Sequence, residues 1–263
     1  MATPGKSNGT TVTRTVAPPV RRLEWQRAQV REVVVETYRV KSLVLQVSNW
    51  RGHLPGQHVD LRLTAEDGYQ AQRSYSIASP AEDDFLALTV ERVDGGEVSP
   101  YLVEDLRAGD QFELRGPIGG YFVWTVATQG PLWLIAGGSG IAPLMAMLRH
   151  RARHKLRAPA LLLYSSRSLD DLIYREELDM MAQGDPDLRV INALTRNQPE
   201  KWTGHRGRIN NALLAESGFP PEQNPKMYVC GPASFVEDIS RFLVELGHDP
   251  LTIKTERFGP SGE

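Results

Sequence analysis

The hydrophobic period of this chain changes once, near residue 130, and that change limits the folds it can adopt. Before that point, short segments with alternating or β-branched apolar residues are separated by turns rich in Gly, Pro and Asp. These segments are residues 30–35, 43–47, 58–63 and 86–90. Short strands at such regular spacing are typical of an antiparallel barrel or sandwich. After that point, apolar runs alternate with segments of helical spacing, and the runs are residues 132–136, which are fully apolar, 160–164, 188–194 and 227–230. This alternation predicts a parallel sheet with crossover helices.

The sequence therefore predicts two domains, and 263 residues are enough for two separate cores. We expect a disordered tail over residues 1–22, an antiparallel β-barrel over 23–127 and an α/β parallel-sheet domain over 128–263. Within the barrel, Ser99-Pro100 offers an N-cap and a proline at the first helical position, which predicts one short helix over residues 101–106.

Composition excludes several classes of protein. Lys and Arg number 30 against 32 Asp and Glu, and a net charge of -2 argues against a general nucleic-acid or anionic-membrane binder. A single cysteine, Cys230, excludes a disulfide framework and a cysteine-ligated zinc or iron–sulfur cluster on this chain. His53, His58 and His205 show no spacing that indicates a role. We therefore assign them to packing or to the surface and expect no metal site.

Location is predicted from two absences in the sequence. No apolar run approaches the roughly 20 residues that a membrane span needs. Arg21-Arg22 resembles the start of a twin-arginine export signal, but the residues after it are amphipathic and not an apolar region. We expect a cytoplasmic protein.

A glycine cluster follows the first apolar run of the second half. In residues 137–143, Gly-Gly-Ser-Gly-Ile-Ala-Pro, a strand leads into glycines and then into a helix that begins with a proline. Glycines let a backbone approach an anion closely, and a helix N-terminus presents N–H groups, so a pyrophosphate is the natural ligand. The spacing is not Gly-x-Gly-x-x-Gly, and a tight turn that needs glycines only for steric reasons is the alternative.

The next strand ends in Ser166 and Arg167, and Tyr174-Arg175 follows on the next helical segment. In doubly wound sheets this strand end faces the adenosine ribose, where a carboxylate would suit NAD and a hydroxyl with a cation would suit a 2′-phosphate. No carboxylate precedes Asp170, which favours NADPH over NADH. In the alternative, Arg167 is only a solvated charge at a strand end.

A strand in the first half carries a second candidate site. Residues 73–80, Arg-Ser-Tyr-Ser-Ile-Ala-Ser-Pro, offer a cation for phosphate, an aromatic plane for stacking and small hydroxyl groups. Gly95-Gly96 and Ser99 form a glycine turn that enters a helix, and residues 116–122 form a further constrained turn. Without the other motifs, an ordinary strand with a buried tyrosine would explain residues 73–80 as well.

Together these motifs resemble the ferredoxin–NADP reductase superfamily. Arg73-x-Tyr75-Ser76-x-x-Ser79 is similar to its flavin motif, and Gly95-Gly96-x-x-Ser99 to its pyrophosphate turn. Residues 137–143 and Cys230-Gly231-Pro232 are similar to its nucleotide motifs. The resemblance implies a flavin-binding antiparallel barrel followed by a nicotinamide-nucleotide domain.

The resemblance also implies roles for individual residues. Ser76, near flavin N5, Cys230, beside the nicotinamide, and Glu256 are the implied catalytic residues. On the flavin side the implied cofactor-binding residues are Arg73, Ser74, Tyr75, Ser76, Val90, Arg92, Gly96, Val98, Ser99 and Phe258, the last stacking on the open flavin face. On the nucleotide side they are Gly138, Ser139, Gly140, Ile141, Ala142, Ser166, Arg167, Tyr174, Arg175, Cys230, Gly231 and Pro232. The Gly-Gly-x-x-Ser turn and Ser79 favour FAD over FMN.

The implied function is electron transfer from NADPH or NADH through FAD to a separate acceptor protein such as a ferredoxin, an oxygenase or a haem protein. The alternative is a self-contained reductase of free flavin or quinone.

A basic run follows the glycine turn and comprises Arg149, Arg151, Arg153, Lys155 and Arg157. It either steers an acidic partner or complements the C-terminus of a helix at the surface.

Overall fold

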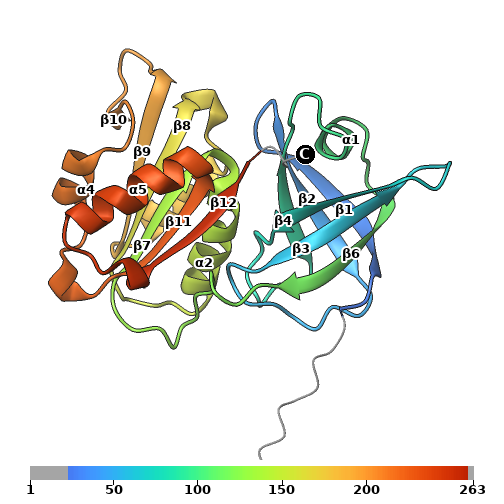
Figure 1. Ribbon diagram of the computed structural model, residues 1–263, viewed down its shortest axis with the longest axis horizontal. Helices are drawn as coiled ribbons and strands as arrows, with labels where there is room; N and C mark the ends of the chain where they lie inside the picture. The colour runs from blue at the N-terminus through green and yellow to red at the C-terminus, as the bar shows by residue number, and fades with distance from the viewer. Residues whose placement is uncertain (1–22, 260–263) are drawn as a thin grey trace, which may run out of the picture.

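The computed structural model describes residues 23–259, so the predicted disordered tail and the last four residues lie outside the described range. Two sheets form the molecule, side by side in Figure 1, and the helices belong mainly to the second. The first sheet ends with strand β6 and the second begins with β7. This is the two-domain fold that the change in hydrophobic period predicts.

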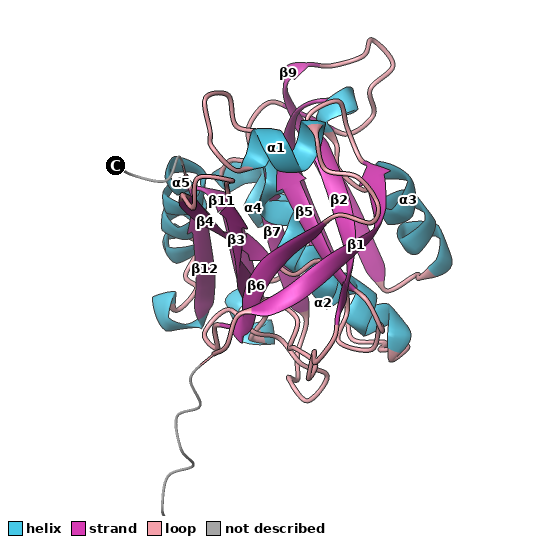
Figure 2. Cartoon of the chain, turned by 90° about the vertical axis from the view of Figure 1, so that its right-hand side faces the viewer, coloured by secondary structure: helices cyan, strands magenta, loops and turns pink. Residues whose placement is uncertain are grey.

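The first sheet has six strands in the order β4-β3-β6-β1-β2-β5, and every neighbouring pair is antiparallel. Its strands are β1 (Gln26–Val35), β2 (Val40–Val47), β3 (His58–Thr64), β4 (Gln70–Ser76), β5 (Leu86–Glu91) and β6 (Gln111–Ile118). A bridge between Ile77 and Leu88 joins the two edges and closes the sheet into a barrel. Strands β1 and β6 of this barrel face the viewer in Figure 2. Alternation places Val59 and Leu61 of β3 inside. The short helix α1 (Ser99–Glu104) lies between β5 and β6.

The second sheet also has six strands, in the order β10-β9-β8-β7-β11-β12, and every pair is parallel. Its strands are β7 (Leu132–Gly137), β8 (Ala160–Ser168), β9 (Leu188–Asn197), β10 (His205–Arg206), β11 (Lys226–Pro232) and β12 (Ile253–Phe258). Its helices are α2 (Ile141–Arg153), α3 (Arg175–Gly184), α4 (Asn211–Ser217) and α5 (Ala233–Glu245).

Both faces of this sheet are covered, because alternate residues of β7 pack to opposite sides. Leu134 and Ala136 join the core under α2 and α3, while Trp133 and Ile135 join the core under α4 and α5. From β7 the chain runs outward through β8 and β9, whereas β11 and β12 lie on the other side of β7. The gap beyond the ends of β7 and β11 is therefore the topological switch point, where open parallel sheets bind ligands.

The core under α2 continues into the barrel, because Phe122 and Trp124 of the connecting segment and Ala78 of the barrel belong to the same buried cluster. The Tyr228 hydroxyl donates to the carbonyl of Val123 at 2.8 Å, which fixes the connecting segment on the second sheet. Within residues 23–259, no helix combines the length and apolar character that a membrane crossing requires.

Candidate active site

The predicted glycine turn lies at the switch point, directly after β7. Gly138–Gly140 form one turn of 3-10 helix, and α2 begins at Ile141. A Cβ on Gly140 would lie 2.3 Å from the carbonyl oxygen of Cys230, so the turn and the end of β11 touch through their backbones. Gly138 has a φ of +57°, and no atom of the described chain lies within 4 Å of where its Cβ would be. The turn is therefore closed on the β11 side and open on the other, as a backbone phosphate cradle requires.

Ser166 and Arg167 lie near the end of β8, next to this turn. Ser166 is buried, and its carbonyl accepts a hydrogen bond from the Thr195 hydroxyl at 3.1 Å, which fixes the strand end. Arg167 is exposed, and its side chain is available to an anion at the carboxyl edge of the sheet.

Tyr174 lies elsewhere than the sequence predicts. It has a φ of +59° immediately before α3 and is only 5% exposed. Its hydroxyl hydrogen-bonds the Thr89 hydroxyl of β5, and the Arg149 guanidinium lies 4.8 Å from the ring centre. The side chain is thus an element of the domain contact and not of the strand edge that carries Arg167, whereas Arg175 is exposed on the first turn of α3.

In the barrel, the structure brings the cation and the glycine turn of the flavin motif together. Arg73 on β4 donates to Glu97 at 3.2 Å, and Tyr69 donates to the other oxygen of the same carboxylate at 3.0 Å. Glu97 follows Gly96 directly and precedes the first turn of α1. Ser99 begins this helix and does not cap it, because its Oγ accepts the N–H of Val93 at 3.0 Å, and Val98 is the N-cap. A guanidinium beside a helix N-terminus is a suitable environment for a diphosphate.

The remaining residues of β4 point to two different neighbours. Ser74 donates to Asp60 at 2.7 Å on one face, while Tyr75 is half-buried against the barrel core on the other. Ser76 ends the strand, half-buried, opposite His58 of β3. Ser79 lies beyond the strand and accepts the N–H of Ala87 at 3.0 Å, so it holds β5 in place.

Two predicted flavin-side residues have other neighbours. Val90 is fully buried in the barrel core. Arg92 donates to Asp94 and Glu104 in a surface network. Among residues 23–259, the Arg92 side chain forms no hydrogen bond with Arg73 or with the glycine turn.

The two domains meet at Glu256 and His58. Strand register places Glu256 of β12 opposite Cys230 of β11, and His58 of β3 opposite Ser76 of β4. Nδ1 of His58 lies 4.0 Å from Oε1 of Glu256. The contact therefore brings the strand pair that carries Cys230 up to the strand pair that carries Ser76, so all three predicted catalytic residues border one junction.

Burial sets the protonation of this junction. It raises the pKa of Glu256 to about 7 and lowers the pKa of His58. It also raises the pKa of the Cys230 thiol well above its usual value, so this thiol is not activated as a nucleophile. No sequence pattern identifies His58 as a site residue, because only the strand pairing places it beside Ser76 and the domain contact places it beside Glu256.

The residues present fit a flavin dinucleotide and a nicotinamide dinucleotide. Oε2 of Glu256 is buried and has no hydrogen-bond partner among residues 23–259, as expected of a group that faces a ligand. The open side of Gly138 and the cation beside α1 supply separate anion sites. Phe258 ends β12 opposite Pro232 and is 36% exposed, so its ring is accessible at the same edge of the sheet.

The basic run is largely neutralised by carboxylates. Arg149 donates to both oxygens of Glu177, at 2.8 and 2.6 Å, and Arg153 donates to Asp83 at 2.7 Å. Arg151 is buried and paired with Asp185, and Arg157 lies 3.7 Å from Asp187. These pairings favour the alternative in which the run complements the C-terminus of a helix, although Arg151 is buried and not at the surface.

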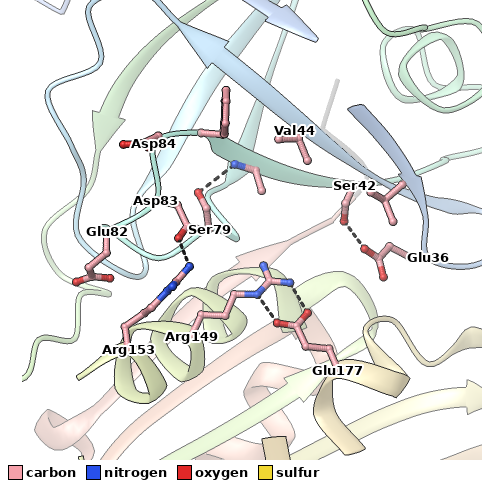
Figure 3. Close-up of a pocket in the computed structure, with 13 residues that line it drawn as sticks. Glu36, Ser42, Val44, Ser79, Glu82, Asp83, Asp84, Arg149, Arg153 and Glu177 are labelled. Carbon is pink, nitrogen blue, oxygen red and sulfur yellow. Dashed lines mark hydrogen bonds and ion pairs between the residues drawn. The ribbon is translucent and has the colours of Figure 1, made fainter. Parts of the chain in front are cut away.

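A cavity of about 730 Å³ lies between the domains beside Arg149 and Arg153 (Figure 3). Its polar lining is mainly acidic and includes Glu36, Glu82 and Asp84. Its lining includes Ser79 of the flavin motif, but none of Ser76, Cys230 and Glu256. This cavity is therefore separate from the junction of Glu256 and His58.

Comparisons with known proteins agree with this division of the chain. The family described as the oxidoreductase FAD-binding domain matches residues 28–123, and the family described as the oxidoreductase NAD-binding domain matches residues 134–241. The FAD- and NAD-binding domains are thus the barrel and the parallel-sheet domain.

Three individual proteins illustrate the similarity. The glycine betaine monooxygenase reductase subunit of Pseudomonas aeruginosa is 32% identical over 209 residues, which are 79% of this chain and 56% of that protein. The flavohem-like FAD/NAD-binding domain of nitric oxide dioxygenase from Vibrio cholerae has a TM-score of 0.81 at 27% identity, covering 89% of this chain and 99% of that one. The cytochrome P450 reductase of Amycolatopsis has a TM-score of 0.81 at 29% identity, covering 95% and 74%. The chain spans little more than half the length of the monooxygenase reductase subunit.

Proposed function

The chain belongs to the ferredoxin–NADP reductase superfamily, and on that premise we propose that it is an NAD(P)H-dependent flavoprotein reductase. It takes electrons from NADPH through bound FAD and delivers them to a separate acceptor protein. We place it in the cytoplasm, on the sequence pattern that follows Arg21-Arg22.

The observation that carries this proposal is the approach of His58 to Glu256 across the domain junction, at 4.0 Å. It supports a site in which the barrel strands that carry Ser76 and the sheet strands that carry Cys230 face one reaction centre. A protein that bound only one of the two cofactors would have no need to bring these four side chains together.

When bound, FAD supplies the redox chemistry, because it accepts a hydride from nicotinamide and can release electrons singly. The protein's own residues bind and orient. Arg73 and the first turn of α1 hold the flavin diphosphate, and residues 138–142 hold that of the nicotinamide dinucleotide. Ser76 offers its hydroxyl to the reacting edge of the flavin. Glu256, with a pKa of about 7, can hold a proton at Oε2 or release it near neutral pH.

The proposal of a separate acceptor rests on two observations. A single cysteine cannot ligate an iron–sulfur cluster, so these 263 residues do not supply a one-electron carrier of that kind. Similar proteins named as reductase subunits or reductases serve a monooxygenase and a cytochrome P450. The choice of NADPH rests on Ser166 and Arg167 at the end of β8.

An absorbance spectrum of the purified protein, before and after anaerobic addition of NADPH and then NADH to parallel samples, tests the proposal. We expect a flavin spectrum that NADPH bleaches faster than NADH. Colourless protein that does not bind added FAD would contradict the flavin site. A yellow protein that neither nucleotide bleaches would contradict the reductase function.

A further inference from the structure

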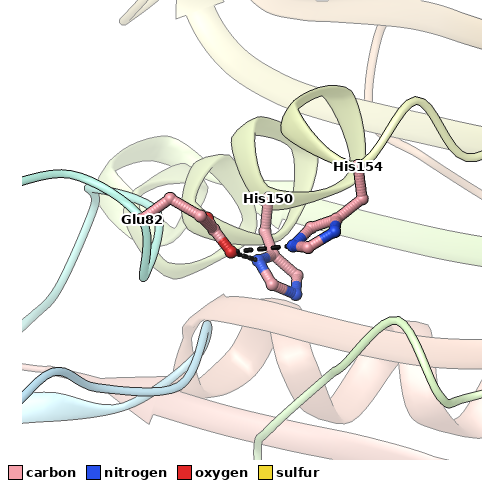
Figure 4. Close-up of side chains that lie close together, drawn as sticks. All are labelled: Glu82, His150 and His154. Carbon is pink, nitrogen blue, oxygen red and sulfur yellow. Dashed lines mark hydrogen bonds and ion pairs between the residues drawn. The ribbon is translucent and has the colours of Figure 1, made fainter.

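Three side chains with metal-binding atoms converge at the domain contact, away from the junction of Glu256 and His58. Glu82 comes from the loop between β4 and β5 of the barrel, and His150 and His154 come from the end of α2 (Figure 4). Oε1 of Glu82 lies 2.7 Å from Nδ1 of His150 and 2.9 Å from Nε2 of His154. All three atoms lie within 4.8 Å of one another.

The two histidines meet because they are four residues apart, which puts them on one face of a helix. Their ring centres are 4.6 Å apart. The edge-on indole of Trp124, whose centre lies 5.8 Å from that of His150, helps to hold the His150 ring in place. The helix and its packing thus preorganise two imidazoles, and the barrel loop supplies the carboxylate.

Hydrogen bonding accounts for part of this arrangement, since Nε2 of His154 and Oε1 of Glu82 are 2.9 Å apart. The His150 side chain is only 9% exposed, and its Nδ1 makes a 2.7 Å ion-pair contact with Oε1 of Glu82 that lacks the angles of a hydrogen bond. The carboxylate therefore satisfies this buried ring nitrogen only in part. A cation between the nitrogen and the oxygen would satisfy both.

We propose that Glu82, His150 and His154 form a site for a divalent transition-metal ion of the zinc class, and that this ion ties the barrel to the nucleotide-binding domain. Two imidazoles and one carboxylate are a ligand set that zinc accepts, with water in the fourth position. Asp83 does not supply that fourth ligand, because its carboxylate accepts from Arg153.

The geometry needs an adjustment of the side chains. Zinc at about 2.0–2.1 Å from each ligand requires ligand atoms roughly 3.3 Å apart. The two oxygen–nitrogen separations, 2.7 and 2.9 Å, must lengthen by a few tenths of an ångström, and the two nitrogens, which lie within 4.8 Å of each other, must reach the same spacing. Glu82 and His154 can supply this by side-chain rotation, because their side chains are 32% and 41% exposed. Glu82 also lines the interdomain cavity, which gives an ion a path from solvent.

The site is distinct from the proposed cofactor machinery. Gly140, at the phosphate turn, and His150 are ten residues apart along α2 and its entry, or about 15 Å at 1.5 Å per residue. None of the predicted cofactor-binding residues belongs to the cluster. The ion would therefore act on the domain contact, beside the ion pair of Arg153 and Asp83.

The test is titration of metal-free, chelator-treated full-length protein with zinc chloride by isothermal calorimetry. The wild type should bind one zinc ion per chain. His154→Gln and Glu82→Gln each remove one ligand at a partly exposed position and should weaken binding at least tenfold. Arg153→Gln is the matched control, because it breaks the neighbouring interdomain ion pair on the same helix and leaves the three ligands intact. It should bind zinc as the wild type does.

Thermal unfolding gives a second readout. Zinc in excess should raise the Tm of the wild type and of Arg153→Gln by several degrees, and chelation should reverse the rise. The rise should be smaller in His154→Gln, because that variant binds zinc more weakly. Magnesium chloride should have no such effect, because magnesium prefers oxygen ligands. The proposal is overturned if the wild type binds no zinc at micromolar concentrations, or if both ligand variants bind it as tightly as the wild type.

Discussion

The two cofactor sides of this molecule are assembled in different ways. On the nucleotide side, the phosphate turn is a run of consecutive residues after β7, and it contacts the end of the neighbouring strand β11 through backbone atoms. On the barrel side, Arg73 reaches the turn before α1 across 24 residues of sequence, through a side-chain contact with Glu97. One side depends on backbone fit and the other on a charge placed from a distant strand.

This difference predicts which changes each side tolerates. Crowding the backbone should damage the nucleotide side and leave the barrel intact. Removing one charge should damage the barrel side and leave the nucleotide side intact.

Gly140→Ala should lower kcat/KM for NADPH by about 100-fold or more, because a displacement of about 1 Å in a positioning element can cost that much. The new Cβ would lie 2.3 Å from a backbone oxygen of Cys230, so either the turn or the strand end must move. FAD content should stay at the wild-type level. Steady-state kinetics and the flavin-to-protein absorbance ratio measure the two effects.

Gly184→Ala is the control for that change, because no atom lies within 4 Å of the Cβ it would introduce at the end of α3. It should behave as the wild type. Normal NADPH kinetics in Gly140→Ala would show that the backbone contact between the turn and β11 is not needed.

Arg73→Gln should weaken FAD binding about 10- to 100-fold, the usual effect of losing a hydrogen bond to a charged group. NADPH binding should change little. Fluorescence titration of flavin-free protein measures the FAD affinity. Glu97→Gln is the matched control, since it removes the partner that Arg73 has in this structure and should leave FAD affinity unchanged or higher. Equal FAD affinity in Arg73→Gln and the wild type would contradict the claim that the barrel side depends on the charge of Arg73.

The contrast between features made by neighbouring residues and contacts made by distant segments also explains what could be predicted from the sequence. The fold class followed from hydrophobic period, and the glycine turn followed from neighbouring residues, because both signals are local. Strand β6 gave no such signal, since only Phe112 and Leu114 alternate inward before Gly116-Pro117 interrupts the pattern. Tyr174 could not be placed, because the left-handed turn before α3 directs it to Thr89 of the other domain.

Contacts between domains were the least predictable part. The approach of His58 to Glu256 depends on strand register in both sheets and on how the sheets face each other. The spacing of His150 and His154 was visible in the sequence, but their carboxylate partner Glu82 lies on the other domain.

Glu256→Gln tests the junction through the pH dependence of stability. Burial raises the pKa of Glu256 from an ordinary 4.5 to about 7, so the folded state binds a proton more tightly than the unfolded state. The wild type should therefore lose stability as pH rises from about 4.5 through 7, by on the order of 2 kcal/mol. Gln does not titrate, so the Tm of Glu256→Gln relative to the wild type should rise between pH 5 and pH 8.

Glu216→Gln, at an exposed position on α4, is the control for Glu256→Gln and should show no such trend. A constant Tm difference across this range would contradict the burial of a carboxylate at the junction.

The smallest effect is expected from Arg167→Ala at the end of β8. If Arg167 binds the 2′-phosphate as proposed, its removal should raise KM for NADPH about tenfold and leave KM for NADH nearly unchanged, because only NADPH carries that group. Tyr174→Phe is the informative comparison, since its hydroxyl bonds Thr89 across the domain contact. It should lower Tm and leave the ratio of the two KM values as in the wild type. If Tyr174→Phe changed that ratio and Arg167→Ala did not, the ribose phosphate would lie at the domain contact, and the nucleotide side would depend on a distant side chain as the barrel side does.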